Sequence, residues 1–122
     1  MNFGVIGLSH DHVWDVLPEL AENENAELVA ATSLQTPLLN RAKKEYDVNV
    51  YTDSQEMAAS EQLDAVLIYG NNRSGAEEAV KALERGWHVL IEKPLAADLA
   101  GANALLQAAD SEGKRLMVNW PI

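Results

Sequence analysis

The chain has 122 residues, 48% of them hydrophobic, which is the size and composition of one globular domain with one core. Nine Lys and Arg against 19 Asp and Glu give a formal net charge of -10, which opposes binding to nucleic-acid phosphates and to anionic membranes. Cysteine is absent, which excludes disulfides, thiolate metal sites and cysteine nucleophiles. The chain shows no basic region followed by a long apolar run, as an export signal has, and no apolar stretch approaches the length of a membrane span, about 18 residues. We therefore expect a cytoplasmic protein.

Short apolar or β-branched runs alternate with longer segments of helical period along the whole chain. The expected strands are residues 3–6, 28–31, 48–51, 65–69, 88–91 and 116–119. Several are almost entirely apolar, as is typical of parallel strands buried on both faces. The alternation predicts the α/β class, with residues 1–122 forming one Rossmann-type domain. Right-handed crossovers then predict a doubly wound parallel sheet in the order 3-2-1-4-5-6.

Helices are predicted between these strands wherever apolar residues recur at helical spacing. The recurring positions are 13, 16, 17 and 20, then 76, 79, 80 and 83, then 99, 102, 106 and 109. Pro18 lies inside the first of these helices, where it removes a backbone hydrogen bond, so we expect a kink or an early break.

Capping residues predict where several helices begin and end. Thr36, followed by Pro37, is expected to be the N-cap of a helix that continues through residue 46. Gly86 and Gly113 occupy positions at which helix ends favour glycine.

The turn after the first strand occupies the place of a dinucleotide-binding turn. Such a turn has three glycines in the pattern G-x-G-x-x-G. The chain keeps only the first of them, and the expected phosphate-binding residues are Gly7, Leu8, Ser9, His10, Asp11 and His12. The position of the turn, between a predicted strand and a predicted helix, is the one that the motif requires. The alternative is an ordinary turn in which Ser9 caps the helix.

His10 and His12 flank Asp11, a grouping that suggests a metal site or acid–base chemistry. Alternate residues of a helix point to different sides, so the two imidazoles are not expected to bind one metal unless the loop is irregular. We therefore predict no metal, and we expect both histidines to form hydrogen bonds near the phosphates or to line the site.

Ser33 follows the second strand, where NAD sites place an acidic residue for the ribose hydroxyls. Serine leaves room for a 2′-phosphate, but no arginine follows it, so NADP is favoured only slightly over NAD. The alternative is a plain loop serine. The segment 70–75 follows the fourth strand at the same edge, and it is suited either to touching the cofactor or only to capping the next helix.

Glu92, Lys93 and Pro94 follow the fifth strand. A lysine beside a cofactor can hydrogen-bond a substrate oxygen and move its proton during hydride transfer. Pro94 restricts Lys93 to an extended conformation, which would direct the side chain. The alternative is a surface lysine in a loop.

Taken together, these segments resemble the glucose-fructose oxidoreductase, inositol dehydrogenase and MocA family (Gfo/Idh/MocA). The resemblance is carried by residues 4–7, 40–42, 63–68, 79–86, 87–96 and 113–118. The Glu-Lys-Pro segment after a strand containing His-Val-Leu is fairly specific to that family.

The resemblance implies an NAD(P)-dependent oxidoreductase that acts on a sugar, a cyclitol or a related polyol, with a nicotinamide dinucleotide as its partner. It places Lys93 at the family's catalytic lysine and Asn72 at the asparagine of a Thr-Pro-Asn loop. Glu92 and Pro94 would then border the nicotinamide pocket. Three departures concern cofactor binding: Gly70 and Asn71 replace Thr-Pro, Gly75 replaces a usual histidine, and Ser33 replaces a frequent aspartate.

Family members resemble this chain only in about their first third, and a larger substrate domain follows. That domain is absent from the 122 residues, so we expect the chain by itself to turn over no substrate, whether it is a fragment, an excised domain or a natural short protein. The rival hypothesis is a non-catalytic module that senses a nucleotide or pairs with another protein. An apolar face left exposed would also promote homo-oligomerisation.

Overall fold

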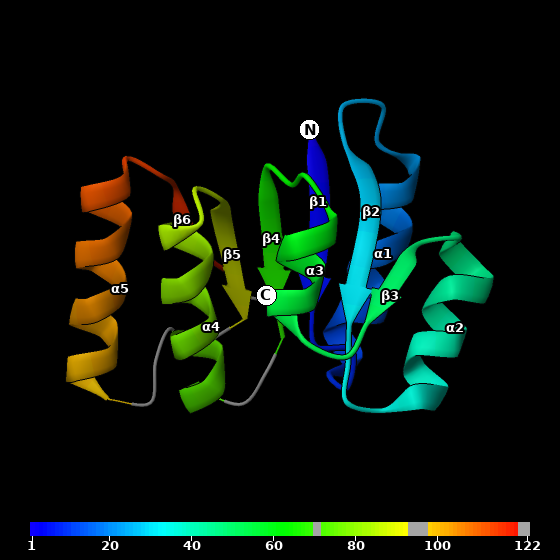
Figure 1. Ribbon diagram of the computed structural model, residues 1–122, viewed down its shortest axis with the longest axis horizontal. Helices are drawn as coiled ribbons and strands as arrows, with labels where there is room; N and C mark the ends of the chain where they lie inside the picture. The colour runs from blue at the N-terminus through cyan, green and yellow to red at the C-terminus, as the bar shows by residue number, and fades with distance from the viewer. Residues whose placement is uncertain (70–71, 93–97, 120–122) are drawn as a thin grey trace.

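A computed structural model describes residues 1–69, 72–92 and 98–119, with only the backbone described at 72–74 and 119. Within this part, six strands form one parallel sheet, and their arrows in Figure 1 point toward the same edge. The strands are β1 Asn2–Ile6, β2 Glu27–Thr32, β3 Asn49–Tyr51, β4 Ala65–Ile68, β5 His88–Glu92 and β6 Leu116–Asn119.

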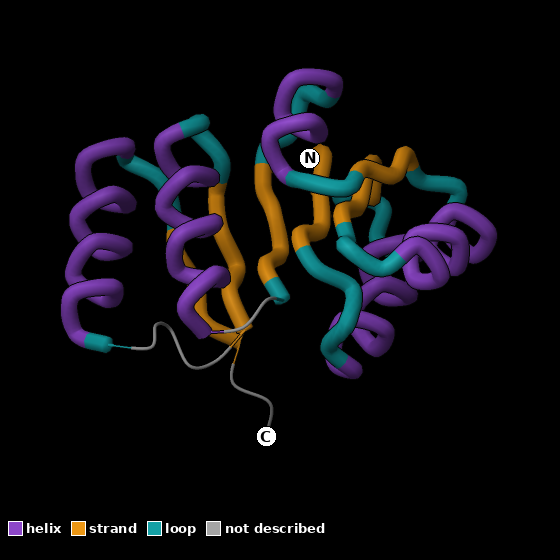
Figure 2. The backbone as a smooth tube through the Cα atoms, turned by 60° about the horizontal axis from the view of Figure 1, so that its bottom comes forward, coloured by secondary structure: helices purple, strands orange, loops and turns teal. Residues whose placement is uncertain are grey.

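The strand order is β3-β2-β1-β4-β5-β6, which confirms the predicted doubly wound sheet. The helices are α1 Asp11–Glu22, α2 Thr36–Tyr46, α3 Ser54–Ser60, α4 Asn72–Glu84 and α5 Leu99–Glu112. Seen from the edge at which the strands end, helices cover the sheet on both sides (Figure 2).

The core divides into two apolar clusters, one on each face of the sheet. One cluster buries side chains of α1 and α2, including Val13, Leu17 and Leu39, against β1, β2 and β4. The other buries side chains of α3, α4 and α5, such as Met57 and Leu105, against the opposite face. Because the strands are covered on both sides, they need apolar side chains at successive positions, which is why β4 is buried throughout.

Three details of the helices differ from the predictions. Helix α1 continues through Pro18 to Glu22, so of the expected kink or early break, the early break does not occur. The N-cap of α2 is Gln35, because Thr36 itself takes the first helical position before Pro37.

Helix α3 was missed by the apolar spacing because it is only seven residues long. Its signal is polar: the Asp53 carboxylate accepts a hydrogen bond from the Glu56 backbone amide at 2.7 Å, as an N-cap does.

Two glycines offer a matched test of backbone strain. Gly75 lies inside α4, where an added Cβ would be in ordinary contact with Ile91 and Ile68 at 3.8 and 3.9 Å. Gly86 has open space around it but a φ of +89°, which L residues rarely adopt. The two positions therefore separate helix propensity from backbone strain.

We predict that Gly75→Ala stabilises the fold by up to about 1 kcal/mol through helix propensity. Gly86→Ala should destabilise it by about 1 kcal/mol or more through backbone strain. Urea unfolding monitored by circular dichroism measures both free energies of unfolding. Equal effects of the same sign would contradict the assigned backbone conformations.

Candidate functional site

The first glycine of the turn is required by the backbone. Gly7 directly follows β1 and has a φ of +93°, and its amide donates to the Thr32 carbonyl at the end of β2 at 3.0 Å. A side chain at this φ would strain the chain. The turn therefore directs the chain away from the sheet and into α1.

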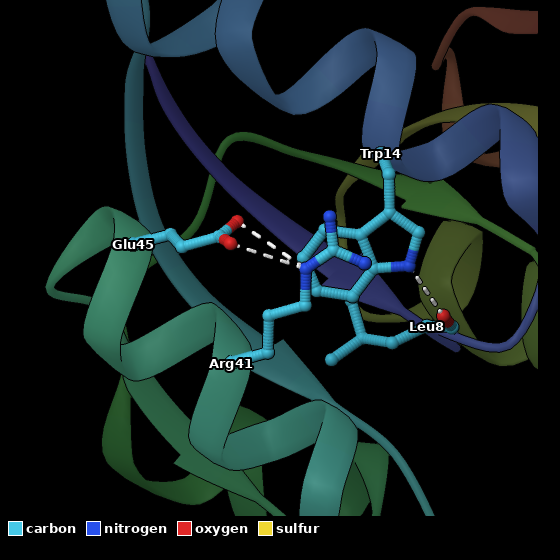
Figure 3. Close-up of polar contacts among 4 residues, drawn as sticks. All are labelled: Leu8, Trp14, Arg41 and Glu45. Carbon is cyan, nitrogen blue, oxygen red and sulfur yellow. Dashed lines mark hydrogen bonds and ion pairs between the residues drawn. The ribbon is translucent and has the colours of Figure 1, made fainter.

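A hydrogen bond from α1 fixes the next residue. The Trp14 indole Nε1 donates to the Leu8 carbonyl at 3.0 Å, and Leu8 is completely buried. The Arg41 guanidinium of α2 lies 3.8 Å from the centre of the Trp14 ring, and its Nε donates to Glu45 (Figure 3). Two helices thus hold the turn from one side.

His10, and not Ser9, is the N-cap of α1. Its backbone is extended, with φ -86° and ψ 135°, and its ring Nδ1 accepts a hydrogen bond from the His12 amide at 3.1 Å. The alternative in which Ser9 caps the helix is therefore wrong, and Ser9 and Asp11 are exposed.

The expectation that the two imidazoles point apart is also wrong, because His10 precedes the helix. Their ring centres are 4.6 Å apart.

His12 is joined to β5 by a contact between residues 80 positions apart. Its Nδ1 lies 3.1 Å from Oε1 of Glu92, the last residue of β5. The Glu92 side chain is only 5% exposed, whereas that of His12 is 39% exposed. With an ionised carboxylate as acceptor, His12 Nδ1 carries the proton, which leaves Nε2 available to a ligand.

One potential metal-ligating atom from each of His10, His12 and Glu92 lies within 4.8 Å of the others. Two ring nitrogens of this group already take part in the hydrogen bonds just described. The positive end of the α1 dipole also opposes a cation at this place. The arrangement therefore favours hydrogen bonding to an anionic or polar ligand.

Tyr69 was not among the residues predicted from the sequence. It follows β4, is 2% exposed, and its amide donates to the Ile6 carbonyl of β1 at 2.8 Å. No described residue accepts a hydrogen bond from its hydroxyl or donates one to it. Burial, with a smaller effect of the Glu92 carboxylate, raises the pKa of Tyr69 to about 12, so the phenol stays protonated at neutral pH.

A cavity of about 340 Å³ opens beside the turn, between the ends of β1, β2 and β4. Its lining includes Gly7, Ser33, Asp53, Tyr69 and Glu78. Ser33 is buried, as its place after β2 requires, and its hydroxyl oxygen accepts a hydrogen bond from the Gln35 amide at 3.1 Å. Two segments predicted to meet at this edge, the Gly7 turn and Ser33, thus line one cavity.

Four of the predicted site residues, Gly70, Asn71, Lys93 and Pro94, lie outside the described residues. Of Asn72, only the backbone at the start of α4 is described.

The order of the strands, the glycine turn and the cavity at the carboxyl edge together define a Rossmann-type nucleotide-binding domain. The family model described as "Oxidoreductase family, NAD-binding Rossmann fold" matches residues 1–120. The chain therefore belongs to the Gfo/Idh/MocA oxidoreductase family, as the sequence resemblance indicated.

Individual relatives agree with this assignment. An uncharacterized oxidoreductase of Rhizobium meliloti is 32% identical over 117 residues, which are 95% of this chain and 35% of the relative. The scyllo-inositol 2-dehydrogenase (NADP(+)) IolU of Bacillus subtilis is 35% identical over 102 residues, which are 83% of this chain and 31% of the relative. The chain thus spans about a third of the length of the curated relatives that it matches.

Among solved structures, a 3-ketoreductase from Actinomadura kijaniata in complex with NADP and TDP-benzene superposes with a TM-score of 0.88 at 30% identity. The match covers 98% of this chain and 37% of the reductase.

Among the described residues, no helix has the length and apolar composition of a membrane-spanning helix.

We predict that Trp14→Phe destabilises the fold by about 1–3 kcal/mol, because the buried Leu8 carbonyl loses its hydrogen-bond donor. Glu45→Gln is the control. It removes only the exposed ion pair with Arg41 and should change stability by less than about 0.5 kcal/mol. Urea unfolding compares the two variants, and a Trp14→Phe variant as stable as the control would show that this hydrogen bond does not hold the turn.

Proposed function

We propose that the chain binds a nicotinamide dinucleotide at the carboxyl edge of its sheet, as the cofactor domain of an oxidoreductase acting on a sugar, a cyclitol or a related polyol. The observation that carries the proposal is the cavity bounded by the Gly7 turn and Ser33. The nicotinamide ring would supply the acceptor or donor of a hydride. The names of the inositol dehydrogenases among the relatives support the substrate class.

The turn fits a diphosphate in a particular way. The amides of His12 and Val13 are already bonded, to the ring and to the carbonyl of His10. Phosphate binding would therefore use the earlier amides of residues 8–11 and the positive end of the α1 dipole. The imidazoles of His10 and His12 would add side-chain hydrogen bonds where a glycine-rich turn offers only backbone.

The cavity also bears on the choice between NAD and NADP. Its lining contains two acidic side chains, Asp53 and Glu78, and no basic residue among those described. A 2′-phosphate would be placed near these carboxylates. We therefore infer a preference for NAD, against the slight NADP preference expected from Ser33 and against the NADP named for two similar proteins.

The remaining assignments stay predictions. Lys93 as the catalytic residue, and Gly70, Asn71, Asn72 and Pro94 as cofactor contacts, rest on their positions after the fourth and fifth strands and on the family resemblance. The catalytic role of Lys93 is tested by Lys93→Ala in a protein that also carries the substrate domain. Unchanged turnover of that variant would contradict the role.

Location and further partners are proposals as well. A cytoplasmic location is part of the proposal, and the net charge of -10 supports the absence of nucleic-acid and anionic membrane partners. Homo-oligomerisation is supported by the exposed Met1 and Met117, which lie with Phe3 and Leu90 around an apolar hollow of about 560 Å³. Light scattering after size-exclusion chromatography measures the oligomeric state, and a monomer at all concentrations would contradict it.

The proposed function predicts that NAD+ stabilises the purified chain against thermal unfolding. At a ligand concentration of one hundred times the dissociation constant, binding at one site adds about 2.7 kcal/mol. Calorimetric titration gives the dissociation constant independently, and ATP serves as the control nucleotide. Absence of both heat and thermal shift with millimolar NAD+ and NADP+ would overturn the proposed function for this chain.

A further prediction concerns the preference between NAD and NADP. Wild type should bind NAD+ more tightly than NADP+, and Asp53→Asn should strengthen NADP+ binding severalfold by removing one negative charge from the cavity. Asparagine keeps the N-cap of α3, so the fold is preserved. An unchanged ratio of the two dissociation constants would show that Asp53 does not set the preference.

A further inference from the structure

The hydroxyl of Tyr69 is a buried hydrogen-bond donor without an acceptor in the described part of the chain. Leaving such a group unpaired costs stability, since unfolding would return it to water. Phenylalanine would fill the same space without that cost. The hydroxyl therefore calls for an acceptor that the described part of the free chain does not provide.

The position of Tyr69 indicates where this acceptor belongs. The strand order reverses between β1 and β4, and ligands of doubly wound sheets bind at that switch point. Tyr69 follows β4 and is hydrogen-bonded to the last residue of β1, so it lies at the switch point itself. It also lines the cavity, together with Gly7.

The neighbouring polar side chains have other partners. The ring of His10 lies 6.0 Å from that of Tyr69, centre to centre, and its Nδ1 accepts the His12 amide. Glu92 is occupied by His12. Tyr69 lines the cavity at this edge, and its protonated phenol can donate to an oxygen of a bound ligand. A dinucleotide offers such oxygens on its diphosphate and on its nicotinamide-side ribose.

We propose that Tyr69 is a cofactor-binding residue whose hydroxyl donates a hydrogen bond to an oxygen of the dinucleotide beyond its adenosine, on the diphosphate or on the second ribose. This inference rests on the proposed function and adds a residue to it. It explains why a tyrosine whose hydroxyl has no partner among the described residues follows β4.

The test compares Tyr69→Phe with Tyr51→Phe, the matched control. The Tyr51 hydroxyl donates to Glu61 at 2.6 Å, and Tyr51 does not line the cavity. Thermal unfolding of the free chains and calorimetric titration with NAD+ are measured for both variants and for wild type.

Tyr69→Phe should keep or raise the unfolding midpoint, because an unpaired donor is removed, and should weaken NAD+ binding about fivefold or more. Tyr51→Phe should lower the midpoint or leave it unchanged, with the dissociation constant within about twofold of wild type. Opposite effects on stability and affinity in Tyr69→Phe are not expected of a merely structural residue.

Titrations with ADP and ADP-ribose separate the two sources of the acceptor. A weaker affinity of Tyr69→Phe for both places the acceptor on the diphosphate, and a weaker affinity for ADP-ribose alone places it on the second ribose. If wild type binds NAD+ and Tyr69→Phe binds it equally well, or loses stability and affinity together, the inference is overturned and the proposed function stands. If wild type binds neither NAD+ nor NADP+, both are overturned.

Discussion

The pairing of β1 between β2 and β4 is the constraint on which the site depends. Because β1 is hydrogen-bonded to parallel neighbours on both sides, the chain that leaves Ile6 must turn sharply between two strand ends. Gly7 makes this turn with a positive φ, and its amide extends the ladder to Thr32 of β2. On the other side, the Tyr69 amide extends the ladder to Ile6. The turn, the cavity and Tyr69 are thus fixed by one central strand.

Loss of the second and third glycines changes how the turn is built. A histidine at the third position brings an imidazole to the start of α1, where Glu92 holds it across the strand ends. His10 caps the same helix with its ring and so uses an amide that a phosphate would otherwise accept from. The imidazoles of His10 and His12 thus form part of the polar surface of the turn, where a glycine-rich turn presents only backbone. The strand order does not reveal this chemical difference.

How far the sequence predicted the site varied with the range of the interactions. Gly7, Ser33 and Glu92 were placed correctly at the sheet edge, because parallel strands of one sheet end at the same edge. The alternative in which Ser9 caps the helix is wrong, because the ring of His10 accepts the capping hydrogen bond. Tyr69 was missed, because an aromatic residue ending an apolar strand indicates core until the lack of a partner for its hydroxyl is known.

The sequence by itself determined the class of the fold and the strand order, since alternating apolar runs and helical periods permit few parallel topologies. It also determined the family, through segments spread over nearly the whole chain. Only the tertiary structure decided that His10 and His12 lie together, that His12 contacts Glu92, and that the Tyr69 hydroxyl has no partner among the described residues. The two histidine contacts join positions far apart in the chain or depend on the backbone angles of the helix cap. Local periodicity does not predict either of them. The turn keeps only one of the three glycines of the motif, and these contacts of His10 and His12 determine its structure.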